Sequence, residues 1–239
     1  MRPIVKGSFP KDSLGRAFVF SDYRKARGEL IKRLGQYCSY CEMKMGASLA
    51  VEHIQPICPE GVSSDIQERK ESWDNFLLAC TNCNSIKGKN DVVLNEYLWP
   101  HNDNTFVALT YTEGGVITPS TQLSDELKRK AHNTITLTGL DRNPLHDLKK
   151  SDRRWENRRE EWNIACDAKA DLFRHDTSVL RNRIVSEAIG HGFWSVWMTV
   201  FHDDSDMCKR LINAFPGTCS DCFDEQKAYL PIQRSTGQI

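Results

Sequence analysis

The sequence lacks any long apolar run, and no segment approaches the roughly 18 consecutive apolar residues that a membrane-spanning helix needs. Its first residues, MRPIVKGSFPKDSLG, also lack the apolar stretch of a secretion signal. These absences argue against a membrane or secreted protein, so we expect a cytoplasmic protein with no membrane partner. In that compartment the nine cysteines are expected to be metal ligands or buried thiols, not disulfides.

Net charge is lacking as well, because 32 Lys and Arg balance 32 Asp and Glu. A neutral protein does not hold nucleic acid by overall charge alone. The charge is uneven, however: residues 1–34 carry a balance of +6 and residues 202–226 a balance of −4. The basic segment could contact phosphate and the acidic segment a protein partner, or both could simply be solvated surfaces.

The residue pattern predicts three parts in a chain long enough for one large domain or two modest ones. We expect a basic N-terminal arm and helix over residues 1–35, a compact module over residues 36–100, and a β-hairpin followed by a helical region over residues 101–239. The module contains the residues with the clearest chemistry.

Caps and turns predict the individual elements. Ser21 or Asp22 can cap the first helix, and Pro144 can open a long helix with a solvated face of alternating arginines and glutamates. Residues 106–111 are expected to form a strand, and Gly190 and Gly192 to separate two helices. The expected helices lie at about residues 22–34, 125–139, 144–173, 178–189, 193–201 and 205–215.

Two Cys-x-x-Cys pairs, Cys38/Cys41 and Cys80/Cys83, predict a structural zinc site. Each pair lets one turn of backbone present two thiolates to one metal, and two pairs complete a tetrahedral site without an open position. The alternative is four buried thiols at accidental spacing. A further pair, Cys219/Cys222, could join Cys208 or His202 around a second metal, but ordinary thiols are the preferred interpretation because only one pair is present.

The loop between the cysteine pairs carries groups suited to hydrolysis. Residues 51–54 read as a strand, which places Glu52 and His53 on opposite faces unless the strand bulges or twists. A carboxylate and the amide oxygen of Asn84 suit Mg²⁺ or Mn²⁺, and a neutral histidine is a suitable general base. Lys87, one helical turn beyond Asn84, could contact a phosphate.

These motifs together resemble the HNH endonucleases in their zinc-containing ββα-metal form. The elements in order are Cys38-x-x-Cys41, Glu52-His53-Ile54, Trp73-Asp74-Asn75 and Cys80-x-x-Cys83-Asn84-x-x-Lys87-Gly88. The resemblance implies an α+β fold with a small zinc-stabilised module and a mainly helical C-terminal region. It implies that His53 is the general base, that Glu52 and Asn84 bind the catalytic metal, and that Asn75 orients the base. Glu52 and Asn84 depart from the commoner aspartate and histidine, but both have a coordinating oxygen.

The C-terminal half is similar to PtuB-type HNH proteins of Septu and retron-associated anti-phage systems. The similar segments are FWSVW (193–197), LINAFPGT (211–218) and CFD (222–224). This resemblance implies a bacterial defence nuclease that works in a complex with PtuA, an ABC-type ATPase. In retron systems the complex also includes a reverse transcriptase and its multicopy single-stranded DNA.

Two other functions fit parts of the same pattern. One is a zinc-module adaptor without catalysis, although Glu52, His53, Asn75 and Asn84 would serve no purpose there. The other is a restriction or homing nuclease that acts without a partner. DNA is the default substrate, and no residue in the pattern selects DNA over RNA or transfer RNA.

Overall fold

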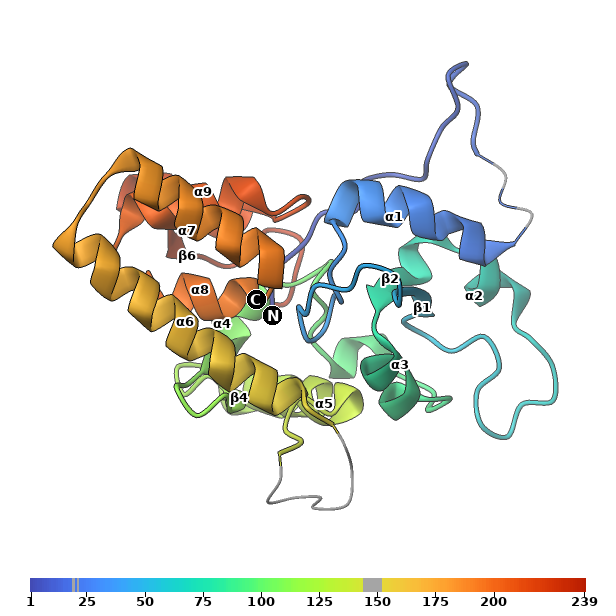
Figure 1. Ribbon diagram of the computed structural model, residues 1–239. Coiled ribbons are helices and arrows are strands. Elements are labelled where there is room, and N and C mark those ends of the chain that lie inside the picture. The colour runs from blue at the N-terminus through green and yellow to red at the C-terminus, as the bar shows by residue number, and fades with distance from the viewer. Residues whose placement is uncertain (19, 21, 144–151) are drawn as a thin grey trace.

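The computed structural model describes residues 1–18, 20, 22–143 and 152–239, and these residues form the expected mixture of helices and short strands (Figure 1). The α-helices are α1 (Arg27–Leu34), α2 (Gln67–Glu71), α3 (Thr81–Lys87), α4 (Thr105–Ala108), α5 (Asp125–Thr138), α6 (Arg154–Arg174), α7 (Ser178–His191), α8 (Trp194–Val200) and α9 (Ser205–Ala214). The strands are β1 (Ala50–His53), β2 (Phe76–Ala79), β3 (Leu109–Tyr111), β4 (Ile117–Pro119), β5 (Phe223–Asp224) and β6 (Leu230–Pro231), which pair in sequence order as antiparallel hairpins. Single 3₁₀ turns lie at Tyr23–Ala26, Trp73–Asn75, Leu94–Glu96, Ser220–Cys222 and Glu225–Lys227.

The expected ββα unit consists of β1, β2 and α3. Glu52 lies opposite Leu77 and His53 opposite Phe76 in the antiparallel pair, so these two neighbours of β1 face opposite sides. All four residues of β2 are buried, because this apolar strand packs against α1 as well as β1. Helix α3 starts at Thr81, directly after Cys80, whose sulfur caps it by accepting from the backbone N–H of Cys83.

Helix α8 is the centre of the helical region, and its sequence is apolar nearly all round. Every residue of α8 except Thr199 is buried. It packs against α6, α7 and α9, which lie around it in Figure 1. The prediction of a mainly helical C-terminal region is therefore confirmed for the described residues.

The helical region is joined directly to the first cysteine turn. Backbone hydrogen bonds run from Lys44 to His191 (3.2 Å) and from Phe193 to Glu42 (3.0 Å), and Met43 pairs with Gly192. Gly192 has φ of 92°, and a Cβ there would lie 2.3 Å from the Glu42 carbonyl oxygen, so only glycine fits. The buried side chains of both regions belong to one continuous core.

Two bases of the N-terminal arm are buried structural groups. The Lys6 ammonium donates to the carbonyl oxygens of residues 73, 74 and 76 at 2.7–3.0 Å, and burial lowers its pKa to about 7. Arg2 donates to the carbonyls of Leu34 and Pro216 at 2.8 and 2.7 Å. These two cations therefore do not face solvent. Residues 10–18 form a projecting turn closed by a bridge between Lys11 and Ala17.

Several expected boundaries were wrong. The strand expected from Phe106 begins only at Leu109, because the Asn104 side chain caps a short helical turn before it. Gly190 lies inside α7, so Gly192 alone ends that helix. The first helix begins as a 3₁₀ turn capped by Asp22, while Ser21 lies outside the described residues. The long helix begins at Arg154, after the non-helical Asp152; Pro144 lies outside the described residues.

The polar face of α6 was expected to be solvated, and this is wrong for three of its residues. Arg154, Arg158 and Glu161 are each less than 5% exposed and face the interior. Only the outer side carries the expected kind of ion pair, such as Arg153 with Glu156 at 2.9 Å. Among the described helices, no segment has the length and apolar character needed to cross a bilayer.

Candidate metal and hydrolytic sites

The two cysteine turns meet as expected. Their four sulfur atoms lie within 4.8 Å of one another, and all four side chains are buried. Cys41 and Cys80 have sulfurs 3.7 Å apart, close to the roughly 3.8 Å edge of a tetrahedron with Zn–S bonds of about 2.3 Å. The cluster therefore fits structural zinc. Elsewhere in the described part of the chain no group of three potential ligands gathers in this way, so Cys219 and Cys222 lack the partners that a second site needs.

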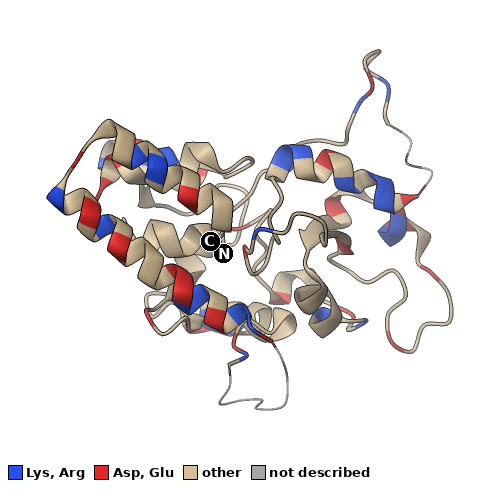
Figure 2. Ribbon diagram, viewed as in Figure 1, with Lys and Arg blue, Asp and Glu red and all other residues tan. Residues whose placement is uncertain are grey.

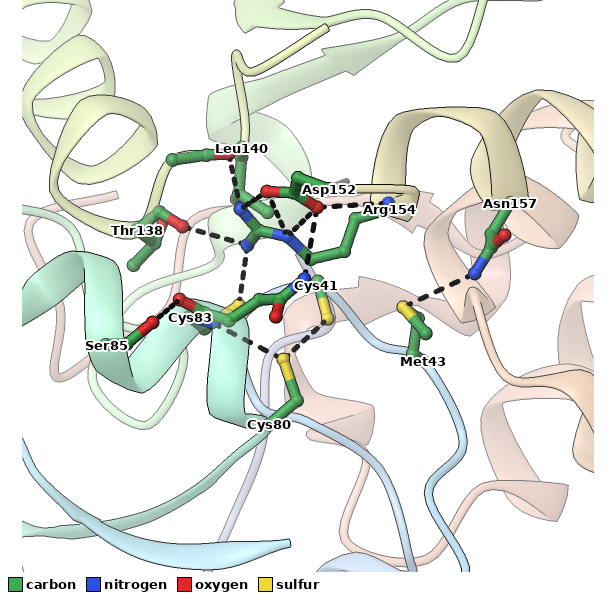
Figure 3. A network of polar contacts seen from close by, with 12 residues as sticks. Cys41, Met43, Cys80, Cys83, Ser85, Thr138, Leu140, Asp152, Arg154 and Asn157 are labelled. Carbon is green, nitrogen blue, oxygen red and sulfur yellow. Dashed lines mark hydrogen bonds and ion pairs between the residues drawn. The ribbon is translucent and has the colours of Figure 1, made fainter. Parts of the chain in front are cut away.

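Arg154 of α6 is the main polar neighbour of this cluster (Figure 3). Its Nη1 donates to the Cys83 sulfur at 2.9 Å and to the Thr138 carbonyl at 2.9 Å, and its Nη2 donates to the Gly139 carbonyl at 2.8 Å. Asp152 accepts three further bonds from the same guanidinium. Four thiolates around Zn²⁺ carry a net charge of about −2, so a buried guanidinium beside them offsets part of that charge.

Glu52 and Lys87 form a buried ion pair beside the cysteine cluster. Their oxygen and nitrogen atoms are 2.9 Å apart, and both side chains are less than 4% exposed. Burial raises the pKa of Glu52, and the Lys87 ammonium and the Tyr40 hydroxyl counter part of that rise. Lys87 also donates to the His53 carbonyl at 2.8 Å. Lys87 is thus enclosed by protein, whereas the expected phosphate contact would need an exposed ammonium.

Asn84 lies one turn before Lys87 on α3, so both side chains leave the same face of the helix. Because Lys87 reaches Glu52 across that face, Asn84 lies on the side of α3 that faces β1. It is partly exposed, unlike Lys87. A carboxylate and an amide oxygen suit a hard divalent cation. The Glu52 carboxylate is 3% exposed and already paired with Lys87, so a cation there would have to replace the ammonium.

His53 faces the other side of β1 and is held by three neighbours. Its Nε2 lies 3.2 Å from the Lys70 carbonyl oxygen, and its ring contacts the rings of Tyr23 and Phe76 with centroids 4.5 and 5.2 Å apart. A carbonyl oxygen can only accept, so in the neutral ring Nε2 carries the proton and Nδ1 keeps its lone pair. Burial lowers the pKa of His53, which favours this neutral form.

Asn75 ties together the segments on both sides of His53. Its Oδ1 accepts from the Gln55 backbone N–H at 2.7 Å. Its Nδ2 donates to the carbonyls of Gln55 and Arg69 at 2.9 and 2.8 Å. These bonds link the end of β1 to the segment that carries the Lys70 carbonyl. The geometry therefore gives Asn75 the position that an orienting residue needs.

Three of these neighbours were not expected from the sequence: Tyr23, Lys70 and Arg154. Tyr23 and Lys70 belong to no recognisable sequence motif. Tyr23 contacts His53 through its ring and Lys70 through its backbone carbonyl oxygen. Arg154 is 71 positions from Cys83 and looks like an ordinary residue of a charged helix. Only the burial of α6 distinguishes it.

The acidic segment near the C-terminus is largely engaged within the chain. Arg181 contacts Asp204 and Asp206 at 2.9 and 3.2 Å, and Lys169 contacts Asp203 at 2.6 Å. Because these carboxylates have cationic neighbours in the same chain, the solvated-surface interpretation suits them better than an open acidic patch.

Comparison with known proteins identifies the ββα unit. Residues 38–90 match the family model for HNH endonucleases, and this range includes both cysteine pairs, Glu52, His53 and α3. The chain therefore contains an HNH endonuclease domain, which indicates a nuclease. No curated protein matches the sequence.

Proposed function

We propose that the chain is a metal-dependent endonuclease that hydrolyses phosphodiester bonds in nucleic acid, with DNA as the default substrate. The observation that carries the proposal is the His53 ring within the HNH domain, held by the Lys70 carbonyl so that Nδ1 is free to accept a proton. Glu52 lies on the opposite face of β1, where its buried carboxylate is paired with the Lys87 ammonium at 2.9 Å.

In the proposed reaction, Nδ1 of His53 takes a proton from water as the oxygen attacks phosphorus. The bond from phosphorus to O3′ breaks, and O3′ leaves with a proton from solvent. The resemblance assigns a divalent cation to Glu52 and Asn84, and bound there it would stabilise the negative charge on the phosphate and the leaving oxygen. That role requires the Glu52 carboxylate to turn from Lys87 toward the His53 side of β1. Asn75 is a positioning residue in this scheme, because it links β1 to the segment whose carbonyl fixes the ring.

The role of Lys87 in the proposal differs from a phosphate contact. Its ammonium binds the Glu52 carboxylate and the His53 carbonyl, so it holds both ends of the Glu52-His53 pair in place. A buried carboxylate needs such a partner to stay charged. We assign Lys87 to positioning.

The test compares His53→Ala with His132→Ala, which removes an exposed histidine of α5. Plasmid cleavage is measured with Mg²⁺ or Mn²⁺, and zinc content and circular dichroism report the fold. His53→Ala should lose about 10²–10⁴-fold in rate with zinc retained, while His132→Ala cleaves normally. Normal cleavage by His53→Ala would refute the assignment. No cleavage by the unmodified chain, with or without partners, would favour the adaptor function.

We further propose that this nuclease is the effector of a bacterial anti-phage complex with a PtuA-type ABC ATPase and, in a retron version, with a reverse transcriptase and its DNA. The support is the likeness of segments 193–197, 211–218 and 222–224 to PtuB-type proteins, together with the neutral charge of the chain. Co-purification of the chain with such an ATPase from a common operon, and cleavage that requires both, would test this. Full activity without a partner would favour a stand-alone nuclease.

A further inference from the structure

A cavity of about 610 Å³ lies beside the His53 ring. Three of its lining residues, Tyr23, Lys70 and Phe76, are those that contact the ring. The volume is in the range of about 300–1,000 Å³ typical of pockets that enclose a small organic group. The proposed hydrolysis makes no use of this space.

Aromatic side chains form much of the cavity wall. Besides Tyr23 and Phe76, the N-terminal arm contributes Phe9, Phe18 and Phe20, with Phe20 centred 5.9 Å from Phe9 and 5.1 Å from Phe18. The Phe18 side chain is 45% exposed, so its ring is accessible to a ligand from solvent. Aromatic rings that line a cavity are suited to hold a flat aromatic group by stacking.

The polar groups of the cavity favour a neutral ligand with N–H donors over a phosphate. The lining includes three carboxylates, those of Asp22, Asp65 and Glu71. Its two cations are already paired, Arg24 with Asp22 at 2.6 Å and Lys70 with Asp65 at 3.0 Å. Carboxylate oxygens accept hydrogen bonds from the exocyclic amines of nucleobases. Phosphate would meet unfavourable charge here.

Positive charge lies outside the cavity instead. Helix α1 follows directly from the turn that contains Tyr23 and Arg24, and it carries Arg27, Lys32 and Arg33 against Glu29. Figure 2 shows these blue segments along the helix. A strand whose base enters the cavity would thus have its phosphates near a basic surface.

We propose that this cavity binds an unpaired, amine-bearing nucleobase of the substrate, so that the enzyme acts on single-stranded nucleic acid. A base inside a duplex has its edge paired and its faces stacked, and it cannot present them to an aromatic pocket. The proposal rests on the proposed nuclease function, because it makes the cavity a substrate site next to His53. It names the substrate class that the HNH motif leaves open.

The test measures binding, so it does not depend on cleavage. A short fluorescent strand of adenine and cytosine nucleotides, in deoxy and ribo forms, is titrated with the full zinc-loaded chain without added Mg²⁺ or Mn²⁺. The same strand is also offered as a duplex. The variant is Phe18→Ala, and the control is Leu14→Ala, which removes a 73% exposed apolar residue of the same arm that does not line the cavity.

We expect the single strand to bind at least about tenfold more tightly than the duplex. Phe18→Ala should weaken single-strand binding by about 5- to 100-fold, the range for loss of one stacked base, while Leu14→Ala should not. Equal binding of single strand and duplex, or an unchanged Phe18→Ala, would overturn the proposal. If the strand binds as expected and no cleavage follows when metal is added, the base site stands and the nuclease function fails.

Discussion

Replacing Arg154 by methionine should weaken zinc binding and destabilise the fold, for two separable reasons. The first is charge: the guanidinium is 3% exposed and lies 2.9 Å from the Cys83 sulfur, where it faces a cluster of net charge about −2. Removing a neighbour of this kind typically lowers metal affinity by about 10–100-fold, or about 1.4–2.8 kcal/mol. Methionine keeps much of the side-chain length but none of the charge.

The second reason is the loss of donors at the end of α5. Arg154 donates to the carbonyls of Thr138, the last residue of that helix, and of Gly139, which caps it; neither carbonyl has an intrahelical partner. It also neutralises Asp152, whose side chain is 11% exposed. Leaving one member of such a buried network without its partner costs about 3–5 kcal/mol. We therefore expect a fall of that size in the free energy of unfolding.

Two measurements separate these effects. Competition with a coloured zinc chelator gives the affinity of the folded chain, and urea denaturation in excess zinc gives its stability. The matched control is Arg158→Met, one turn further along α6, because Arg158 is 2% exposed and donates to the carbonyls of Gly115 and Leu140 at 2.9 and 3.0 Å but to no cysteine. The control should lose stability and keep its zinc affinity within a few-fold.

Unchanged zinc affinity in Arg154→Met would refute the charge argument. Arg154 would then act only as a hydrogen-bond donor to the carbonyls at the end of α5. Equal loss of zinc in both arginine variants would show that the metal responds to folding and not to the sulfur contact. A Cys80→Ser variant should lose zinc and unfold the module, and it shows how large the loss of zinc affinity and stability is when a ligand itself is removed.

Two further predictions concern buried charges. Burial raises the pKa of Glu161 to about 7 from its ordinary value of 4.5, so the chain should gain stability as the pH falls through 7 toward 4.5, by at most about 3 kcal/mol. Glu161→Gln keeps an acceptor for the Trp197 ring N–H and should lack this gain when stability is measured by urea denaturation. If the free energy of unfolding changed with pH in the same way in Glu161→Gln and in the unmodified chain, the reasoning would be contradicted. Lys87→Met should cost about 3–5 kcal/mol by leaving the Glu52 carboxylate buried and unpaired, and adding Glu52→Gln should recover part of the loss. A double variant no more stable than Lys87→Met would show that the two groups are not coupled.

The parts of the site that could be predicted are those determined by local spacing. Two residues between cysteines determine how one turn presents both sulfurs, and the two-residue period of a strand separates Glu52 from His53. The order of the elements between Cys38 and Gly88 then identifies the domain. The catalytic roles of His53, Asn75, Glu52 and Asn84 remain predictions that the proposed experiments address.

The parts that could not be predicted depend on which face of a helix meets another element. Lys87 was expected to contact a phosphate, but α3 turns it toward β1, where its ammonium binds a buried carboxylate. Arg154 and Arg158 were expected on a solvated face, but α6 packs over the cysteine cluster and α8. Charged residues at helical spacing show that they share one face of a helix, but they do not show whether that face contacts solvent or another element.

The contact between Gly192 and the first cysteine turn bears on how the HNH domain could be transplanted. Residues 38–90 are contiguous, yet the turn at their start is completed by backbone bonds from residues 191 and 193 and by Ser195, which donates to the Glu42 carboxylate at 2.7 Å. Glu42 itself has φ of 66°, a strained value for a residue with a side chain. A fragment cut out at the domain boundaries would lose the groups that hold this strain. The unit that can be moved intact into another protein is accordingly larger than the unit that sequence comparison delimits.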